Sequence, residues 1–226
     1  MKNEALTPTE YRTSIYLDFE GEGKKKDGFI PQPHMAGLFT PNLKGKSGKY
    51  KSVFFLPSWK PVCNHFYNQA VIDDFVDYFD NLSNELSATK QYLVYWTIHE
   101  SMILEKYLPK EIFGRLSPRL HNLHPIARRY ANRTRAFGRS VSTKGKTLEE
   151  FFAALYLKRH PYPPFPLGAA EACRRLDTAC AMHKKYKYFS DKQKGYTDEL
   201  IRYNDGDCRS TWLIAKRLGN YFGSSR

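Results

Sequence analysis

The sequence lacks long apolar runs and has few cysteines. No apolar stretch is long enough to cross a bilayer, and the first residues lack the apolar core of a signal peptide. We therefore expect a cytoplasmic protein with no membrane partner. The cysteines form no C-x-x-C pair, and we expect reduced thiols at Cys63, Cys173, Cys180 and Cys208. A zinc site made of Cys173, Cys180 and His183 is an alternative of unusual spacing.

Negative charge is also scarce. The 226 residues include 23 Asp and Glu against 36 Lys and Arg, a formal net charge of +13. This surplus favours a polyanionic partner, with nucleic acid first and an anionic membrane surface second. The hydrophobic content of 41% is that of a folded globular chain, and the length suits one domain over residues 1–226.

The order of apolar and polar segments in the first half predicts a mixed sheet. Strands joined by short turns are expected at about residues 14–20, 33–40 and 50–57. A helical pattern follows within 69–86, with these residues on one face: Phe75, Phe79, Leu82 and Leu86. The apolar run 91–98 is typical of a strand covered on both faces, and the next helix ends at Pro109. This β-β-β-α-β-α order predicts the α/β class, with helices flanking the sheet.

The second half is mainly helical. We expect helices at about residues 147–157, 169–183 and 198–218. Between the two halves, residues 114–147 hold nine Lys or Arg and no Asp or Glu. We interpret this stretch as a basic insertion within the single domain.

Acidic residues interrupt the first predicted strand, which reads SIYLDFEGEG. Side chains two apart in a strand point to the same side, so Asp18 and Glu20 share a face. Their oxygens are then close enough to bind a hard cation together. A strand end whose acids face water is the alternative that this stretch leaves open.

The last predicted helix carries one polar stripe. Tyr203, Asp207 and Thr211 recur every four residues on a helix that is otherwise built to pack on the sheet. A carboxylate near a sheet surface needs a partner, because an unpaired buried charge is costly. Arg202 or Lys216 could neutralise Asp207, and a metal ion held jointly with Asp18 is the other interpretation.

These two ends of the chain resemble the DEDD exonucleases of the ribonuclease H-like fold. The first-strand Asp-x-Glu of that family matches LDFE, and its Tyr-x-x-x-Asp on the last helix matches YNDGD. The sequence YNDGDCRST resembles in particular the ribonuclease H-like domain found fused to RecB-type nucleases. Position 202 is Arg rather than His, so the tyrosine variant is implied. That subgroup carries a middle glutamate, which VYWTIHES places at Glu100.

The resemblance implies a ribonuclease H-like sheet and a metal-dependent nuclease. Two Mg²⁺ or Mn²⁺ ions would be held by Asp18, Glu20, Glu100 and Asp207, and Tyr203 would orient the attacking water. The expected reaction is 3′–5′ exonucleolytic hydrolysis of single-stranded DNA or RNA. It also implies a possible protein partner that supplies a RecB-type nuclease or a helicase.

The basic stretch is our candidate for contacts with the phosphate backbone. The residues concerned are Arg128, Arg129, Arg133, Arg135, Arg139, Lys144 and Lys146. Two other functions stay open: an endonuclease of the same fold, and a nucleic-acid-binding module that no longer turns over.

Overall fold

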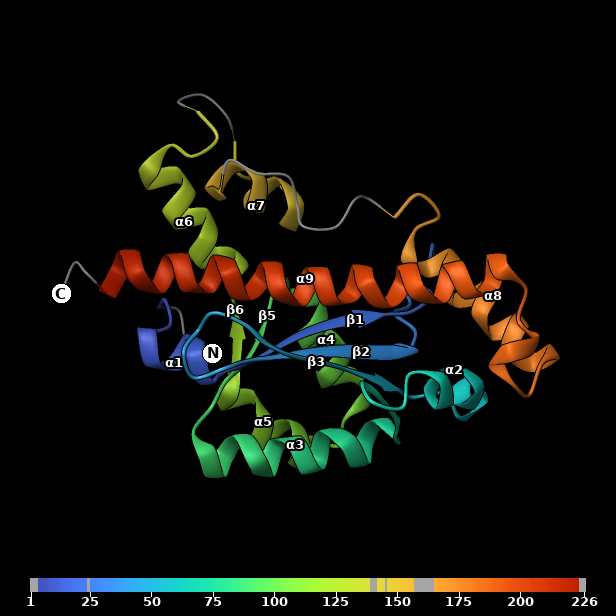
Figure 1. Cartoon of the computed structure of the whole chain (residues 1–226). Helices are drawn as coiled ribbons and strands as arrows, with labels where there is room; N and C mark the ends of the chain where they lie inside the picture. Colours follow the sequence, from blue (N-terminus) through green and yellow to red (C-terminus); the bar gives the residue numbers. More distant parts are fainter. Residues whose placement is uncertain (1–3, 24, 139–141, 145, 157–164, 224–226) are drawn as a thin grey trace.

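A six-stranded mixed sheet forms the centre of the protein (Figure 1). The computed structural model describes residues 4–23, 25–138, 142–144, 146–156 and 165–223. The strands are β1 (Ile15–Glu20), β2 (Met35–Pro41), β3 (Gly48–Phe54), β4 (Ala70–Ile72), β5 (Leu93–Tyr95) and β6 (Leu120–Asn122). They lie in the order β4-β3-β2-β1-β5-β6, and β2 runs antiparallel to both of its neighbours. The remaining pairings are parallel. The predicted α/β class is therefore confirmed.

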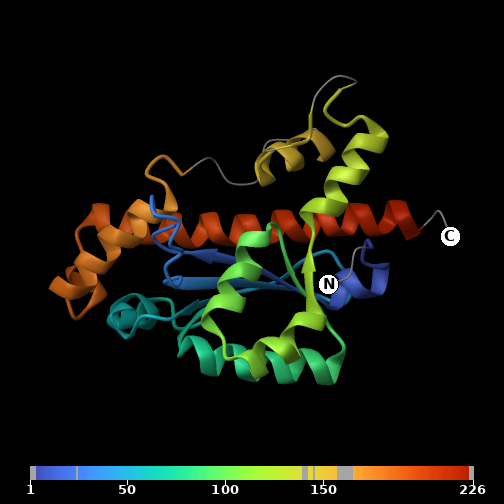
Figure 2. The same cartoon turned by 180° about the vertical axis from the view of Figure 1, so that it is seen from behind.

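Helices cover both faces of the sheet (Figures 1 and 2). The helices on one face are α3 (Phe75–Thr89), α4 (Ile98–Tyr107) and α5 (Lys110–Leu116). The long helix α9 (Asp191–Gly223) crosses the other face, joined at one end by α1 (Pro8–Thr13), α6 (His124–Thr134) and α7 (Leu148–Tyr156). Because strand side chains alternate, Ile15 and Leu17 pack toward α3 while Tyr16 packs toward α9. Asp18 and Glu20 consequently belong to the α9 face.

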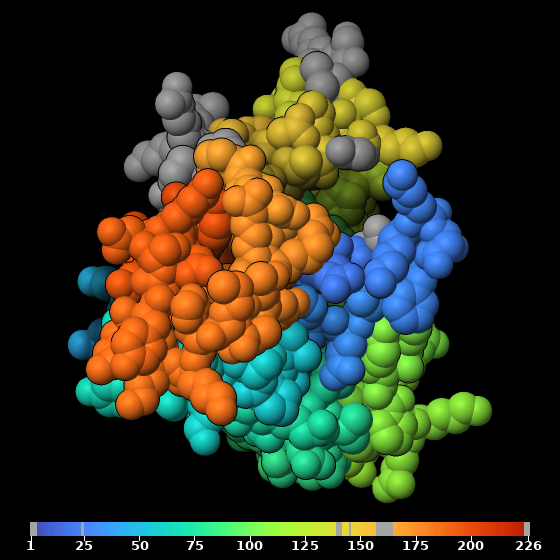
Figure 3. Space-filling model, turned by 90° about the vertical axis from the view of Figure 1, so that its right-hand side faces the viewer, coloured from blue at the N-terminus to red at the C-terminus, as the bar shows by residue number. Residues whose placement is uncertain are grey.

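A third apolar cluster closes one end of the molecule (Figure 3). The elements that build it are α2 (Lys60–His65), α8 (Ala169–Met182), the 3₁₀ turns Pro57–Trp59 and Tyr186–Tyr188, and the first half of α9. Tyr186 and Phe189 are buried here, with the Tyr186 ring stacked on His65 at 4.0 Å. Cys173 and Cys180 lie in the same cluster and are free thiols.

Two predicted boundaries are wrong for identifiable reasons. Residues 70–72, read as part of a helical pattern, pair with β3 as β4, and the helix starts only after Asp74. The Asp74 carboxylate accepts hydrogen bonds from the N–H groups of Val76 and Asp77, which sets that start. The last helix begins at Asp191 rather than near 198, because Ser190 and Gln193 cap each other reciprocally.

The basic stretch 114–147 contains regular structure that the sequence did not reveal. It includes the end of α5, a 3₁₀ turn (Ser117–Arg119), the edge strand β6 and helix α6. The β6 strand pairs with β5, so part of this stretch belongs to the central sheet. The predicted helices near 147–157 and 169–183 correspond to α7 and α8, although residue 157 lies outside the described part of the chain.

Candidate metal centre

Strand β1 and helix α9 bring three acids together. One carboxylate oxygen from each of Asp18, Glu20 and Asp207 lies within 4.8 Å of the other two. Alternation along β1 turns both of its acids toward the helix that carries Asp207. This group could hold a metal ion, since carboxylate oxygens are the ligands that hard divalent cations take. Asp18 and Glu20 lie on the same face of β1, as predicted, and this face is turned toward α9 instead of solvent.

The three acids are in an environment that disfavours negative charge. Glu20 and Asp207 are only 7% and 8% exposed. Burial raises the pKa of Asp18 well above its ordinary value, and the charges of Glu20, Asp207 and Glu100 raise it further. Burial likewise raises the pKa of Glu20 to about 7, and burial followed by the charge of Glu20 raises the pKa of Asp207. A bound cation would remove this penalty, so the donor set and its electrostatics fit a divalent metal.

Asn204 holds the two strand acids in place. Its side-chain amide donates to Asp18 Oδ2 at 2.7 Å and lies 3.4 Å from Glu20 Oε1. Its own carbonyl accepts a hydrogen bond from the Tyr50 hydroxyl at 2.8 Å. Asn204 is completely buried, one turn before Cys208 on α9. The sequence pattern predicts no role for it, although it stands within the YNDGD motif that carries the resemblance.

The approach of Asn204 depends on a glycine in β2. Gly37 lies opposite Asp18 in the β1–β2 register. A Cβ atom at Gly37 would meet Asn204 Oδ1 at 1.5 Å, which no side-chain contact allows. Gly37 therefore leaves the space in which the Asn204 side chain reaches the strand acids.

Glu100 lies near the acid group, but its carboxylate caps the start of helix α4. It lies in the first turn of α4, where its Oε2 accepts hydrogen bonds from the Thr97 backbone N–H at 3.1 Å and the Thr97 hydroxyl at 2.9 Å. Its charge raises the pKa of Asp18, Glu20 and Asp207, and burial raises its own pKa to about 7. The group of three acids within 4.8 Å does not include it.

Tyr203 lies between Asp207 and Glu149, an acid that was not among the predicted site residues. Its hydroxyl is 3.4 Å from Glu149 Oε1, and a hydrogen bond from it lowers the pKa of Asp207. Burial, then the charges of Asp207 and Glu149, raise the pKa of Tyr203 strongly. The phenol therefore stays protonated and acts as a hydrogen-bond donor. Glu149 resembles an ordinary first-turn acid of α7, so no sequence signal distinguishes it.

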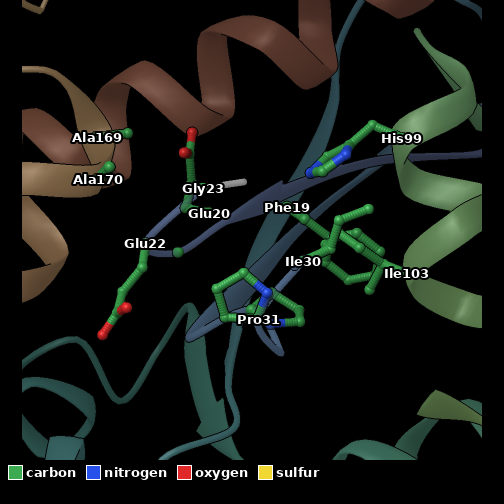
Figure 4. A pocket seen from close by; sticks show the side chains of 12 residues that line it. Phe19, Glu20, Glu22, Gly23, Ile30, Pro31, His99, Ile103, Ala169 and Ala170 are labelled. Atoms are coloured by element: carbon green, nitrogen blue, oxygen red, sulfur yellow. The ribbon is translucent and has the colours of Figure 1, made fainter. Parts of the chain in front are cut away.

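A cavity of about 230 Å³ opens beside Glu20 (Figure 4). Phe19, Ile30 and Ile103 give it an apolar wall, and His99 of α4 projects into it. The Glu20 carboxylate points toward α9, while Glu22 turns away in the opposite direction. Glu20 is thus the member of the acid group that lines this cavity, whereas Asp18 and Asp207 do not line it.

The predicted phosphate-contacting residues are dispersed along and after α6. Arg129, Arg133 and Arg135 are exposed, as is Lys144, while the Arg128 Nε atom is buried. Lys146 forms an ion pair with Glu150 at 2.6 Å, which engages its charge within the protein. Arg139 lies outside the described residues.

Two groups of acidic or histidine side chains among the described residues are close enough to hold a metal ion. One is the acid group of Asp18, Glu20 and Asp207, and the other consists of Glu22, His34 and Asp177. Neither contains the Cys173, Cys180 and His183 of the alternative zinc site.

Comparison with family models, with curated proteins and with solved structures found no match. Within the described part of the chain, no helix is long and apolar enough to span a membrane. The assignment of a function therefore rests on the residues and their geometry.

Proposed function

We propose that the protein is a metal-dependent nuclease of ribonuclease H-like fold. One observation carries the proposal: three buried or half-buried carboxylates, from Asp18, Glu20 and Asp207, present an oxygen each within 4.8 Å in a strongly basic protein. Raised pKa values at all three acids indicate a site that would gain from a countercharge.

The donor set favours Mg²⁺ or Mn²⁺, because every ligand is a carboxylate oxygen. Asp18, Glu20 and Asp207 would hold the metal, and Glu100 is the remaining acid that adds negative charge nearby. Two such ions, when bound, make a water nucleophilic and stabilise the oxygen that leaves the phosphodiester.

The protein's own groups set the geometry of this centre. The Asn204 amide fixes the Asp18 carboxylate and lies close to the Glu20 carboxylate. Both strand acids would therefore keep their orientation when a metal ion binds. The Tyr203 hydroxyl directs its single proton to a neighbouring carboxylate, Asp207 or Glu149, and its oxygen can orient a water by accepting a hydrogen bond from it. Burial and the charges of Asp207 and Glu149 raise the pKa of Tyr203, so the phenol of the metal-free site is a poor base.

The arrangement of the sheet supports the fold assignment. The antiparallel strands β1, β2 and β3 are followed, after α2 and β4, by helix α3, by β5 parallel to β1, and by helix α4, an order compatible with the β-β-β-α-β-α order predicted from the sequence. The short strand β4 is an addition at the β3 edge. The first strand and the last helix carry the acids, as in the DEDD family.

The substrate we propose is single-stranded DNA or RNA, cut from the 3′ end. The cavity beside Glu20 has an apolar wall suited to a terminal base, and its 230 Å³ is too small for a duplex. The exposed arginines Arg129 and Arg133 of α6, a helix that packs on the C-terminal end of α9, would add positive charge for phosphates farther along the strand.

The test is a cleavage assay with end-labelled single- and double-stranded DNA and RNA. Magnesium or manganese should produce a ladder of products, and a chelator should abolish it. Asp18→Asn and Asp207→Asn should each lose activity while keeping their fold. Glu199→Gln, which alters an exposed acid of α9, is the matched control and should cleave normally. Cleavage of a circular single strand would assign an endonuclease activity instead of an exonuclease activity. Wild-type cleavage rates in Asp18→Asn would refute the metal centre.

A further inference from the structure

A second group of potential metal ligands lies at the end of the sheet where α8 and the β1–β2 connection lie side by side (Figure 3). It consists of Glu22, two residues beyond β1, His34, just before β2, and Asp177 of α8. One ligand atom of each lies within 4.8 Å of the other two. The composition of one imidazole and two carboxylates differs from the all-carboxylate centre.

His34 is fixed by the backbone and buried against Trp59. Its N–H donates to the Glu20 carbonyl at 2.8 Å, and its carbonyl accepts from the Phe55 N–H at 2.9 Å. The side chain is 9% exposed, and its ring meets the Trp59 ring edge-on at 5.9 Å. Its position is therefore set by its backbone hydrogen bonds and by packing on Trp59.

The imidazole Nδ1 atom of His34 is buried and has no hydrogen-bond partner among the described residues. It lies 3.4 Å from Asp177 Oδ2, in a geometry that makes no hydrogen bond. A buried polar atom without a partner is costly in free energy. The Nδ1 atom thus faces the Asp177 carboxylate, with which it forms an ion pair when the imidazole is protonated, and a metal ion bound to both groups would take the place of that proton.

The two carboxylates are presented differently. Asp177 Oδ1 accepts a hydrogen bond from Trp59 Nε1 at 2.6 Å, which orients the carboxylate and leaves Oδ2 toward His34. Glu22 turns away from Glu20 (Figure 4) and pairs with Lys25 at 3.4 Å on the surface. Such an exposed ion pair contributes little, so Glu22 is free to exchange Lys25 for another cation.

We propose that Glu22, His34 and Asp177 bind a divalent ion of the zinc type, with water completing the coordination. Imidazole nitrogen suits Zn²⁺, whereas Mg²⁺ prefers oxygen ligands alone. Three protein ligands with an open position are a common zinc arrangement. To coordinate the ion, the one-third exposed Glu22 side chain would leave Lys25 and turn toward His34 and Asp177.

A bound ion would link the β1–β2 connection, which follows Glu20, to helix α8. Glu22 and His34 are the two ends of the connection between β1 and β2, and Asp177 lies on a helix remote in sequence. The proposal concerns separate residues, so it stands or falls independently of the nuclease proposal.

The experiment measures Zn²⁺ binding to the full chain after chelator treatment, by equilibrium dialysis with elemental analysis. The background is Asp18→Asn with Asp207→Asn, which neutralises two ligands of the first centre without changing their shapes. Glu22→Gln and Asp177→Asn are then added singly. Asp177→Asn keeps an oxygen that can accept from Trp59 Nε1, and Glu22→Gln alters only a surface side chain. Glu105→Gln, an exposed acid of α4, is the control.

We expect one Zn²⁺ per chain in the background protein and in the control, with a rise in melting temperature on adding zinc. Each of the two ligand variants should bind at least about tenfold more weakly, since changes around metal ligands already cost that much. Both variants should melt like the background when metal is absent. Absence of zinc from the background protein, or equal affinity in Glu22→Gln and Asp177→Asn, would overturn the site. Equal binding of Mg²⁺ would overturn its zinc character.

Discussion

The Asn204 side chain donates to Asp18 Oδ2 at 2.7 Å, across the contact between the last helix and the first strand. The two residues are separated by nearly the whole sequence, yet this bond fixes the orientation of the acid group. The Tyr50 hydroxyl supports it from β3. The contact makes Asn204 the residue whose loss should affect both the stability and the metal affinity of the centre.

Replacing Asn204 by Asp should destabilise the metal-free protein. The change removes the donor to Asp18 and adds another negative charge among buried carboxylates. We expect a loss of about 1–3 kcal/mol in the free energy of unfolding, the scale of an unsatisfied buried group. Urea denaturation in the presence of a chelator measures it. Asn68→Asp, at an exposed position, should change little, and equal stability of the two variants would contradict the role given to Asn204.

Gly37→Ala should disrupt the same contact from the opposite side. Its Cβ would collide with Asn204 Oδ1, so the Asn204 side chain must leave its place beside Asp18 or the helix and strand must separate. We expect a loss of several kcal/mol, in the range of severe overpacking. Gly114→Ala in α5 meets nothing within 4 Å and should instead stabilise the helix by up to about 1 kcal/mol. A lower melting temperature in Gly37→Ala and a higher one in Gly114→Ala would separate the steric collision at Gly37 from the general stabilising effect of replacing glycine by alanine.

The stability of the metal-free protein should fall as pH rises. Glu20 and Glu100 have pKa values raised from 4.5 to about 7, so the folded state binds protons more tightly than the unfolded state. This contribution is fully present below about pH 4.5 and is lost as pH rises through about 7. Each group accounts for about 3 kcal/mol at most, at 1.4 kcal/mol per pKa unit.

The pH effect can be assigned by denaturation at pH 5, 6, 7 and 8 in a chelator. Glu20→Gln should flatten the dependence, while the exposed control Glu105→Gln should leave it unchanged. Adding Mg²⁺ should also flatten it, because the cation favours the ionised acids. Stability that climbs between pH 5 and 8 in the metal-free wild type would contradict this account.

Tyr203→Phe should reduce catalysis more than stability. The ring and its packing remain, but the hydroxyl bond to Asp207 is removed and the pKa of Asp207 rises. We expect turnover to fall roughly ten- to thousandfold, with the acid limb of the pH profile moved to higher pH. Tyr196→Phe, whose hydroxyl bonds Arg175, is the control on the same helix. Single-turnover cleavage that matches wild type would remove Tyr203 from the mechanism.

Replacing the exposed arginines Arg133 and Arg135 should change the affinity for nucleic acid and leave the cleavage step unchanged. Arg133→Gln with Arg135→Gln should reduce the slope of log affinity against log salt by about 0.7 for each phosphate of a single strand that these side chains neutralise. Lys90→Gln with Lys110→Gln removes the same charge from the α3 and α5 side of the sheet and should leave the slope unchanged. An identical slope in both double variants would assign Arg133 and Arg135 to an ordinary solvated surface.

Local periodicity predicted the faces that carry the three acids, the family resemblance joined these faces into one site, and neither predicted the contacts that support it. The two-residue repeat of β1 and the four-residue stripe of α9 place Asp18, Glu20 and Asp207 on defined faces, and these faces meet. The supporting contacts depend on register between distant segments. Gly37 lies opposite Asp18 only because β1 and β2 pair in one register, and Glu149 reaches Tyr203 from a separate helix.

The missed elements are short or hidden by composition. Strand β4 and helix α2 have three and six residues, which is too few for a periodic pattern to emerge. The first turn of α9 lies in a segment rich in lysine and tyrosine, where the Ser190–Gln193 cap is the only local signal. Glu100 matches the position that the resemblance gave it, but its capping bonds with Thr97 require the folded chain.

Helix α9 fixes how the two clusters that pack on its ends are rotated relative to each other. Its 33 residues extend about 50 Å, and it carries Leu200 in the cluster at one end and Trp212 in the cluster at the other. Asn204 and Asp207 lie between these two anchors. One inserted residue would turn one anchor by about 100° relative to the other. The number of residues between Leu200 and Trp212 is therefore constrained, because an insertion there would rotate one anchor away from its cluster.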